Sequence, residues 1–584
     1  MKLTRASVLL LLVLGCASQP PAAPPAVATA PNRVLLVSFD GVGWDALSGD
    51  PGAGALGSAG WNRIASEGVT ARLIPVSPTL TSVTHISMAT GATPDKTGIV
   101  SNTMHLPGTP PNETEGGFEA EIETDAIWES ARRSGKRVGV ITYPGVDATS
   151  PRRTADFGLV YTSPVSRSSI QTVSGDDLTS GEADGSFSPP RAARLTWKWS
   201  FEGNEVNEPV EIVAIDTTND GAVNYDDFVV RHGSRTFDVG DDRWFPLSMP
   251  LEDDGSAHLF GSWSRIMEFD ASGGKLVVYW GSVSRTIGYP ESFRRMIDER
   301  VGFWPGPPDE FNASLWLRER RGIEPRMFVD QVRRFSDFFT RATALAAAEM
   351  EWDLLLSYQP IVDEVEHQFH LVSPSQQWST PENLETAKGV RRAAYEVFDA
   401  ATAALLNAAP PRTTLVVVSD HGMAPLHTAV RLNRQLELWG FATLDRGRPA
   451  PASRWGAYSS GGHANLHRFG PVVPGDAEEI ARKLGELAAP DGTRVIERVR
   501  VVAPGENPRL GQIEAYLRPG FAFASGSGEV FDRTTYFGQH GYLAHHPGVH
   551  AIFGAWGPGI AKPFPQELEQ TQIRAWIERV LGIR

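Results

Sequence analysis

Two pairs of residues combine a carboxylate with an imidazole at a spacing that suits metal binding. Asp363 and His367 are four residues apart, so on a helix both side chains would project from one face and could hold one ion. The alternative for this pair is a solvated helix face, because further acidic residues lie between them. Asp420 and His421 are adjacent at the end of an apolar run, where Gly422 permits the bend that turns both side chains to the same side.

Three more positions could join these pairs in one site. Asp40 ends an apolar run and precedes Gly41, which suits either a metal ligand or a simple turn. Thr81 lies where a helix is predicted to begin, and that helix would end at Gly91, a typical C-terminal cap. The Thr81 hydroxyl could cap this helix. It could also be a nucleophile, because amide groups at a helix N-terminus stabilise an anionic oxygen and a divalent ion lowers the pKa of a hydroxyl. The third position is His540.

Short apolar runs predict the strands that must position these residues. Runs at 33–40, 137–143, 352–358, 413–419 and 550–553 are typical of strands covered on both faces, and helical patterns separate several of them. One such pattern runs from Val390 to Leu405 and is followed by Pro410 and Pro411, which would end the helix. This alternation predicts an α/β fold with a mostly parallel central sheet flanked by helices. Ligands bind at the carboxyl ends of strands in such sheets, and Asp40 and Asp420 fall there.

The pattern changes twice along the chain. Between about residues 155 and 300, aromatic and β-branched residues alternate with polar ones, which indicates an antiparallel β insertion. Residues 430–530 indicate a smaller α+β lobe with a helical stretch at 476–488. The predicted order is a signal peptide (1–16), a tether (17–32), a first segment of the catalytic core (33–155), the β-rich insertion (156–304), a second core segment (305–430), the α+β cap lobe (431–530) and a third core segment (531–584).

The N-terminal residues predict export and lipid attachment. Lys2 and Arg5 precede a short apolar run, and Val13-Leu14-Gly15-Cys16 resembles a bacterial lipobox. Cleavage before Cys16 and lipidation of its thiol would anchor the protein to a membrane of the bacterial cell envelope, facing the periplasm or the cell surface. A plain secretory signal with a chance cysteine is the alternative. Residues 17–32 are rich in Pro and Ala, as expected of a stiff tether.

Composition excludes several other classes of protein. The 584 residues carry a net charge of -15, which argues against nucleic-acid scaffolding because phosphate binding needs a local excess of Lys and Arg. The single cysteine excludes a disulfide framework and any cysteine-based metal cluster. These patterns carry no information on the oligomeric state.

The candidate residues occur within short motifs whose order along the chain is characteristic of one protein family. These motifs are Phe39-Asp40-Gly41, the segment 81–102, Asp363-x-x-x-His367, Ser419-Asp420-His421-Gly422-Met423 and Gly538-Gln539-His540-Gly541-Tyr542. In this order they resemble the type I phosphodiesterase/nucleotide pyrophosphatase family of the alkaline phosphatase superfamily. The resemblance covers about 300 residues in three blocks and excludes the β insertion.

The resemblance implies a hydrolase of small-molecule or lipid phosphate esters with two Zn²⁺ ions. One ion would be held by Asp363, His367 and His540, and the other by Asp40, Asp420, His421 and the Thr81 oxygen. Thr81 would attack phosphorus to form a phospho-threonine intermediate that water then hydrolyses. Carboxylate and imidazole ligands suit zinc, and a pair of ions can stabilise the attacking and leaving oxygens together.

Two residues near Thr81 depart from the nucleotide-hydrolysing members of that family. Those members have Phe directly after the nucleophile and Asn three residues after it, whereas this chain has Ser82 and Thr84. Loss of the aromatic ring weakens the case for a nucleotide substrate, while Thr84 could still donate a hydrogen bond to phosphate. A phosphodiesterase is the leading hypothesis. The alternatives are a phosphomonoesterase with the same site and an inactive surface-binding lipoprotein.

A second metal site is a weaker hypothesis. Asp216, Thr218, Asp220, Asn224 and Asp227 follow the spacing of a calcium-binding loop around Gly221, so Ca²⁺ could bind there. The flanking residues look like strands, and a hairpin turn is the preferred interpretation. The remaining histidines near the motifs are interpreted as packed or solvent-facing: His85, His463, His545 and His546.

Overall fold

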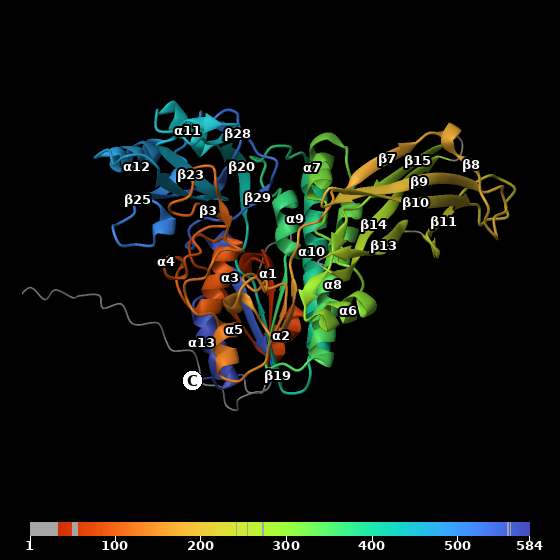
Figure 1. Ribbon diagram of the computed structural model, residues 1–584, viewed down its shortest axis with the longest axis horizontal. Helices are drawn as coiled ribbons and strands as arrows, with labels where there is room; N and C mark the ends of the chain where they lie inside the picture. Colours follow the sequence, from red (N-terminus) through yellow and green to blue (C-terminus); the bar gives the residue numbers. More distant parts are fainter. Residues whose placement is uncertain are drawn as a thin grey trace, which may run out of the picture.

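A nine-stranded sheet forms the centre of the computed structural model (Figure 1). Its strand order is β17 (Ile287–Tyr289), β6 (Phe157–Val160), β5 (Val138–Ile141), β18 (Leu354–Gln359), β1 (Arg33–Phe39), β19 (Thr413–Val418), β30 (Ala551–Trp556), β2 (Val69–Ile74) and β31 (Glu567–Glu569). Neighbours from β6 to β19 are parallel, whereas β17 and β30 run against their neighbours. The predicted mostly parallel sheet is therefore confirmed, and the run near residue 550 forms an antiparallel member of it.

Alternate residues of β1 show why these strands are apolar throughout. Leu35 and Val37 belong to the apolar core on one face of the sheet, and Val34 and Leu36 to the core on the other. Because successive side chains point to opposite faces, a strand covered on both sides needs apolar residues at every position.

Helices cover both faces of the sheet. One face packs against α2 (Trp61–Glu67), α6 (Glu291–Arg300), α7 (Glu310–Glu319), α8 (Pro325–Glu349), α9 (Ile361–Phe369) and α10 (Pro381–Ala408). The other packs against α3 (Thr81–Thr90), α5 (Ile127–Arg133) and α13 (Gln572–Leu581). Helix α10 contains the predicted apolar repeat and ends just before Pro410 and Pro411, as expected. The short helices α1 (Trp44–Ser48) and α4 (Pro94–Thr97) lie in connections.

Two antiparallel sheets occupy residues 169–285 and extend outward from the side of the molecule that carries α7 and α8 (Figure 1). One contains β8 (Thr179–Ser180), β9 (Arg191–Phe201), β10 (Asn204–Ile215), β11 (Asp227–His232) and β12 (Arg235–Asp238). The other contains β7 (Ser169–Val173), β13 (Trp244–Asp253), β14 (Ser256–Asp270), β15 (Lys275–Trp280) and β16 (Ser284–Arg285). Apolar residues of both sheets form one core, so the pair is a β-sandwich.

A smaller α+β region follows β19 and lies at one end of the central sheet (Figure 1). It contains a sheet of β23 (Trp455–Ser460), β24 (His463–Arg468), β26 (Ile513–Leu517) and β25 (Ile496–Val501), with helices α11 (Leu432–Leu438) and α12 (Asp476–Glu486). A second sheet contains β20 (Ala424–Val430), β27 (Gly520–Phe523), β28 (Phe531–Arg533) and β29 (Gly538–Gln539). Short two-residue strands pair elsewhere: β3 (Thr103–Met104) with β4 (Glu115–Gly116), and β21 (Leu444–Asp445) with β22 (Arg448–Pro449).

The structure describes residues 33–48, 56–240, 242–253, 255–270, 274–557, 560 and 562–583. The predicted signal peptide, the lipidation site Cys16 and the tether 17–32 lie outside these residues. Within the described ranges, no helix combines the length and apolar character that crossing a membrane would require.

Candidate active site

The site begins where two central strands end side by side. Strands β1 and β19 are parallel and in register, so Asp40 and Asp420 leave the sheet at the same edge. The amide of Gly41 donates to Asp420 Oδ1 at 3.3 Å. Gly41 has φ of +76°, and a Cβ atom at this position would lie 2.7 Å from the backbone of Asp363. The glycine therefore allows both the turn after Asp40 and the close approach of helix α9.

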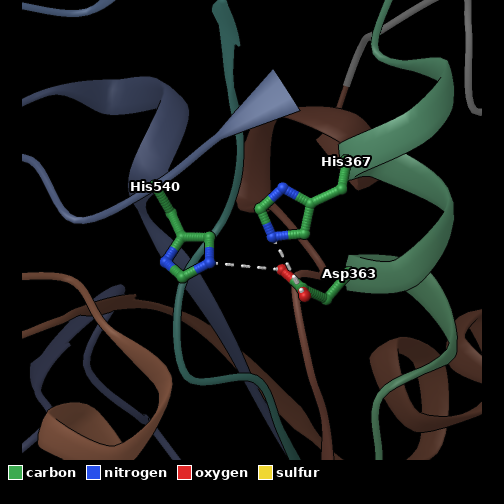
Figure 2. A group of neighbouring side chains, drawn as sticks. All are labelled: Asp363, His367 and His540. Carbon is green, nitrogen blue, oxygen red and sulfur yellow. Dashed lines mark ion pairs between the residues drawn. The ribbon is translucent and has the colours of Figure 1, made fainter. Parts of the chain in front are cut away.

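Helix α9 brings the Asp363–His367 pair to the same edge. The Asp363 amide donates to the Asp40 carbonyl at 3.1 Å, which fixes the start of the helix beside β1. One helical turn later, His367 Nε2 lies 3.4 Å from Asp363 Oδ2. His540, which follows β29, reaches Asp363 from the other side, with 3.6 Å between Nε2 and Oδ1 (Figure 2). The four-residue spacing thus places both side chains together on one helix face.

Six of the predicted metal ligands converge here. Asp363, His367 and His540 form one group whose ligand atoms lie within 4.8 Å of one another, and Asp40, Asp363 and His421 form a second. Asp363 thus belongs to both groups. Asp420 stands beside the second group, since its Oδ2 lies 3.1 Å from His421 Nε2. The imidazole rings of His421 and His540 stack with centroids 3.8 Å apart, which joins the two groups.

Each of the three imidazoles has its second nitrogen against a backbone carbonyl. The Nδ1 atoms of His367, His421 and His540 lie 3.0, 3.1 and 2.9 Å from the carbonyl oxygens of Gly538, Gly422 and Thr79. A proton on Nδ1 would be donated to that carbonyl and leave the Nε2 lone pair free. This arrangement is the usual support of a metal-binding histidine.

Two carboxylates of the site, Asp40 and Asp420, have no protonated partner, because burial lowers the pKa of the neighbouring His421 well below its usual range. Asp40 Oδ1 and Asp363 Oδ1 are buried without a hydrogen-bond partner among the described residues. Burial raises the pKa of Asp40 well above its usual range, and Asp420 and Asp363 raise it further. Burial also raises the pKa of Asp420. A divalent cation would remove this repulsion and favour the ionised carboxylates, so the residues fit a metal centre.

Thr81 is the first residue of α3 and its side chain faces this centre. Its Oγ1 lies 3.3 Å from His421 Nε2. The N-cap residue of α3 is Leu80, which makes no side-chain cap hydrogen bond. The Thr81 hydroxyl therefore does not cap the helix, and helix α3 ends at Gly91 with a φ of +67°, the left-handed conformation expected of a glycine cap.

A cavity of about 440 Å³ opens beside Thr81. Its lining includes five carboxylates, of which Asp147 is paired with Arg153 at 2.9 Å. Among the described residues that line it there is neither Lys nor Arg. Aromatic rings form much of the remaining wall, from Phe118, Tyr143, Tyr161 and Tyr358. Bound cations would supply the positive charge that this lining lacks for holding an anionic ligand.

Two residues of this site were not found from the sequence. Tyr358, near the end of β18, donates to Asp40 Oδ2 at 2.6 Å. Asn102 lines the cavity, and its Oδ1 accepts from the amide and hydroxyl of Ser82 at 2.9 and 2.8 Å. The rule that strand ends carry ligands could have found Tyr358. Asn102 ends the motif segment 81–102, but the residue types gave it no role, because the loop after α3 must fold back to bring it to Thr81.

Thr84 lies outside the cavity. Its side chain is buried, and its hydroxyl donates to the carbonyl of Leu80 at 2.8 Å, with the carbonyl of Thr81 and Asp420 Oδ2 also near. The structure thus does not bring Thr84 to the position of a ligand. The predicted phosphate contact from Thr84 is replaced by a candidate contact from Asn102.

The loop that resembles a calcium site connects the antiparallel strands β10 and β11. Its polar side chains bond to one another: Asp216 accepts from Thr218, and Asn224 donates to Asp220 Oδ2 at 3.2 Å. Asp227 begins β11, as the hairpin interpretation requires.

Calcium binding by this loop stays a prediction. A melting temperature that calcium raises in the wild-type protein but not in D220A would support it. An unchanged melting temperature of the wild-type protein with millimolar calcium would contradict it.

Two of the other histidines are packed inside the protein. His85 is buried behind Thr81, with its Nδ1 2.8 Å from the Thr81 carbonyl and its Nε2 2.8 Å from the Ser38 hydroxyl. Burial lowers the pKa of His85 to about 4, so its imidazole is neutral. His463 is buried in β24 beside Tyr516. Neither lines the cavity.

Zinc binding at the Asp363 group should release a proton. Burial lowers the pKa of His367, but the ion pair with Asp363 outweighs it and raises the pKa to about 9. Below that pH the metal-free protein holds a proton that zinc must displace, so we expect the affinity to rise about tenfold per pH unit between pH 7 and 9. Calorimetry in buffers of different ionisation enthalpy measures this release. An affinity that is constant from pH 7 to 9 would contradict the prediction.

The fold and the site define an α/β protein with a candidate metal centre at the carboxyl edge of its mostly parallel sheet. The family model of type I phosphodiesterase / nucleotide pyrophosphatase matches residues 34–218 and 271–543. The chain belongs to this family and is a phosphoric ester hydrolase of the phosphodiesterase/pyrophosphatase type. The resemblance inferred from the motifs is therefore confirmed. The match extends further than expected, because it includes residues 156–218 and 271–304 of the predicted β insertion.

Comparison with solved structures found similar chains at low sequence identity. Murine ectonucleotide pyrophosphatase/phosphodiesterase 5, an inactive variant in complex with AMP, is 15% identical, with 94% of this chain and 95% of that chain covered and a TM-score of 0.47. The human protein of the same name is 15% identical, with the same coverage and a TM-score of 0.46. Phosphonoacetate hydrolase from Sinorhizobium meliloti 1021 in complex with phosphonoformate is 15% identical, with 96% and 100% covered and a TM-score of 0.46. A search of curated protein sequences gave no match.

Proposed function

We propose that the protein hydrolyses phosphodiesters through a phospho-threonine intermediate on Thr81 at a two-zinc site. The observation that carries the proposal is the convergence of carboxylates and imidazoles beside Thr81 in a cavity without Lys or Arg in its described lining. Bound cations would supply the positive charge that such a cavity needs to hold an anionic ester. The ligand types suit zinc, because mixed imidazole and carboxylate sets bind this borderline ion.

The residues divide between two ions. Asp363, His367 and His540 would hold one, and Asp40, Asp420 and His421 the other, with Asp363 close to both. When bound, two zinc ions supply Lewis acidity that stabilises charge on the attacking and leaving oxygens. The backbone carbonyls behind the three imidazoles fix their rings, so the ligands are oriented before an ion arrives.

Thr81 supplies the nucleophile in this proposal. Its Oγ1 lies at the first residue of α3, where the positive end of the helix dipole favours an anionic oxygen. Attack on the phosphodiester forms a bond from Oγ1 to phosphorus and breaks the bond from phosphorus to one ester oxygen, which leaves as an alcohol. Attack by water then breaks that bond and restores the Thr81 hydroxyl. The buried His85 behind it takes no part in these steps, since its nitrogens face Ser38 and the Thr81 carbonyl.

Asn102 is proposed to position the phosphate. Ser82 engages its Oδ1, so the Nδ2 group is the one that remains to donate to a phosphate oxygen. Replacement of Asn102 by alanine is expected to lower kcat/KM by about 10²-fold, the usual effect of removing a donor to developing charge. Steady-state kinetics with a phosphodiester measures the effect, and an unchanged kcat/KM would remove Asn102 from the site.

The size of the cavity favours diesters over monoesters. A volume of about 440 Å³ walled by Tyr143, Tyr161 and Phe118 leaves room for an apolar or aromatic ester group beside the phosphate. Comparison of bis-p-nitrophenyl phosphate with p-nitrophenyl phosphate tests this directly. We expect a higher kcat/KM for the diester. A higher value for the monoester would favour the phosphomonoesterase alternative, and no turnover of either would contradict the proposed function.

Membrane anchoring is a separate element of the proposal. The lipobox-like residues that end in Cys16, followed by the Pro/Ala-rich segment, support a lipid-anchored enzyme of the cell envelope. We expect the wild-type protein to partition with membranes and C16S to be released into the soluble fraction. Equal partition of both proteins would contradict lipid attachment at Cys16.

A further inference from the structure

A second convergence of ligand atoms lies outside the active-site cavity. Glu497, His545 and His546 place one ligand atom each within 4.8 Å of the others. His546 Nε2 lies 2.7 Å from Glu497 Oε2, and His545 Nε2 lies 3.0 Å from Glu497 Oε1. The two imidazole rings are 4.2 Å apart and inclined by 35°, so both Nε2 atoms face the same carboxylate. None of the three residues lines the cavity beside Thr81.

The backbone holds each of these residues in a defined position. Glu497 lies on β25 where the register with β26 shifts between residues 496 and 498, and such irregularities commonly re-aim a side chain. His545 and His546 directly precede the short 3₁₀ turn Pro547–Val549. The amide of His546 donates to the Leu543 carbonyl at 3.3 Å, which closes the chain on itself before that turn.

The exposure of the cluster suits an ion that is bound from solution. The side chains of Glu497 and His546 are 15% and 24% exposed, whereas that of His545 is 64% exposed. Two ligands are thus anchored in the protein and the third closes the site from outside. Two imidazoles and one carboxylate form a ligand set typical of Zn²⁺, with a fourth position left for water.

We propose that Glu497, His545 and His546 bind a Zn²⁺ ion that joins strand β25 of the smaller α+β region to the segment that carries His540. The ion would link two stretches of the chain about fifty residues apart in sequence, and the linked segment begins five residues after a candidate active-site ligand. Binding would therefore stabilise the folded protein increasingly as the zinc concentration rises above the dissociation constant. This proposal does not depend on the proposed catalytic mechanism.

Metal analysis of tag-free protein tests the site. Metal-free wild-type protein is titrated with zinc by calorimetry, and the bound zinc is counted by elemental analysis after dialysis. We expect H545N and E497Q each to bind one zinc ion fewer than wild type, or to bind that ion at least about tenfold more weakly, since even changes behind a metal ligand have effects of this size. Because His545 is exposed, its replacement leaves the packing of the fold intact.

A matched histidine variant and an activity measurement separate the possible results. His427 belongs to none of the candidate metal groups, so H427N should bind as much zinc as wild type. Phosphodiester turnover at saturating zinc should be retained in H545N, which distinguishes loss of this ion from damage to the active site. Equal zinc stoichiometry and affinity in wild type, H545N and E497Q would overturn the proposal and leave the cluster as a pair of histidine–glutamate hydrogen bonds.

Discussion

Replacement of Thr81 by alanine is expected to lower kcat for phosphodiester hydrolysis by at least about 10³-fold, as removal of a nucleophile does in other enzymes. The Thr81 hydroxyl lies 3.3 Å from His421 Nε2 at the first residue of α3 and is nearly buried. It does not cap the helix, so its loss leaves the helix start unchanged. Steady-state kinetics, zinc content and melting temperature should show that only turnover is affected.

A matched variant and a trapping experiment sharpen this result. T81S keeps a hydroxyl at the same place and should retain far more turnover than T81A. Wild-type protein quenched in acid during turnover should gain the mass of a phosphoryl group on the peptide that contains Thr81, and T81A should not. Full activity in T81A would assign the nucleophile to another group. Loss of zinc in T81A would instead indicate that the Thr81 oxygen helps to hold an ion, as the family resemblance implies.

The architecture of the core was accessible from the sequence because burial on two faces demands continuous apolar runs. Strands β1 and β19 were predicted within one residue of their observed ends. Strand β2 was not predicted, because its residues alternate between buried and half-buried and so lack the continuous apolar run that identified the other core strands. The direction of β30 was also not predictable, since an apolar run carries no information about which way a strand enters the sheet.

The site was predictable where its residues are neighbours in sequence or stand at strand ends. The four-residue spacing of Asp363 and His367 and the adjacency of Asp420 and His421 are enough to predict that the side chains of each pair lie close together. The position of Asn102 depends on how a loop returns to the start of α3, which residue types do not specify. The geometry does not support the predicted phosphate contact of Thr84 for a related reason. The place of a residue on a helix sets the direction of its side chain, and the Thr84 hydroxyl is directed at the Leu80 carbonyl and Asp420 instead of the cavity.

Asp363→Asn is expected to have the second largest effect, because Asp363 is the residue shared by both candidate ligand groups. Its oxygens lie 3.4 Å from His367 Nε2 and 3.6 Å from His540 Nε2. An amide carries no charge and coordinates zinc poorly, so zinc content should fall by at least one ion and kcat by at least about 10³-fold. The rise in melting temperature that zinc gives the wild-type protein should shrink accordingly.

Glu364 provides the matched control for this variant. It is the next residue on α9 and lines the same cavity, but it belongs to neither ligand group. Burial raises the pKa of Glu364 well above its usual range, and Glu310 raises it further, so the neutral acid is favoured and glutamine resembles it closely. E364Q should therefore retain its zinc while D363N loses it. Equal zinc loss in both would contradict a specific role of Asp363 as a ligand, because E364Q changes no residue of either ligand group.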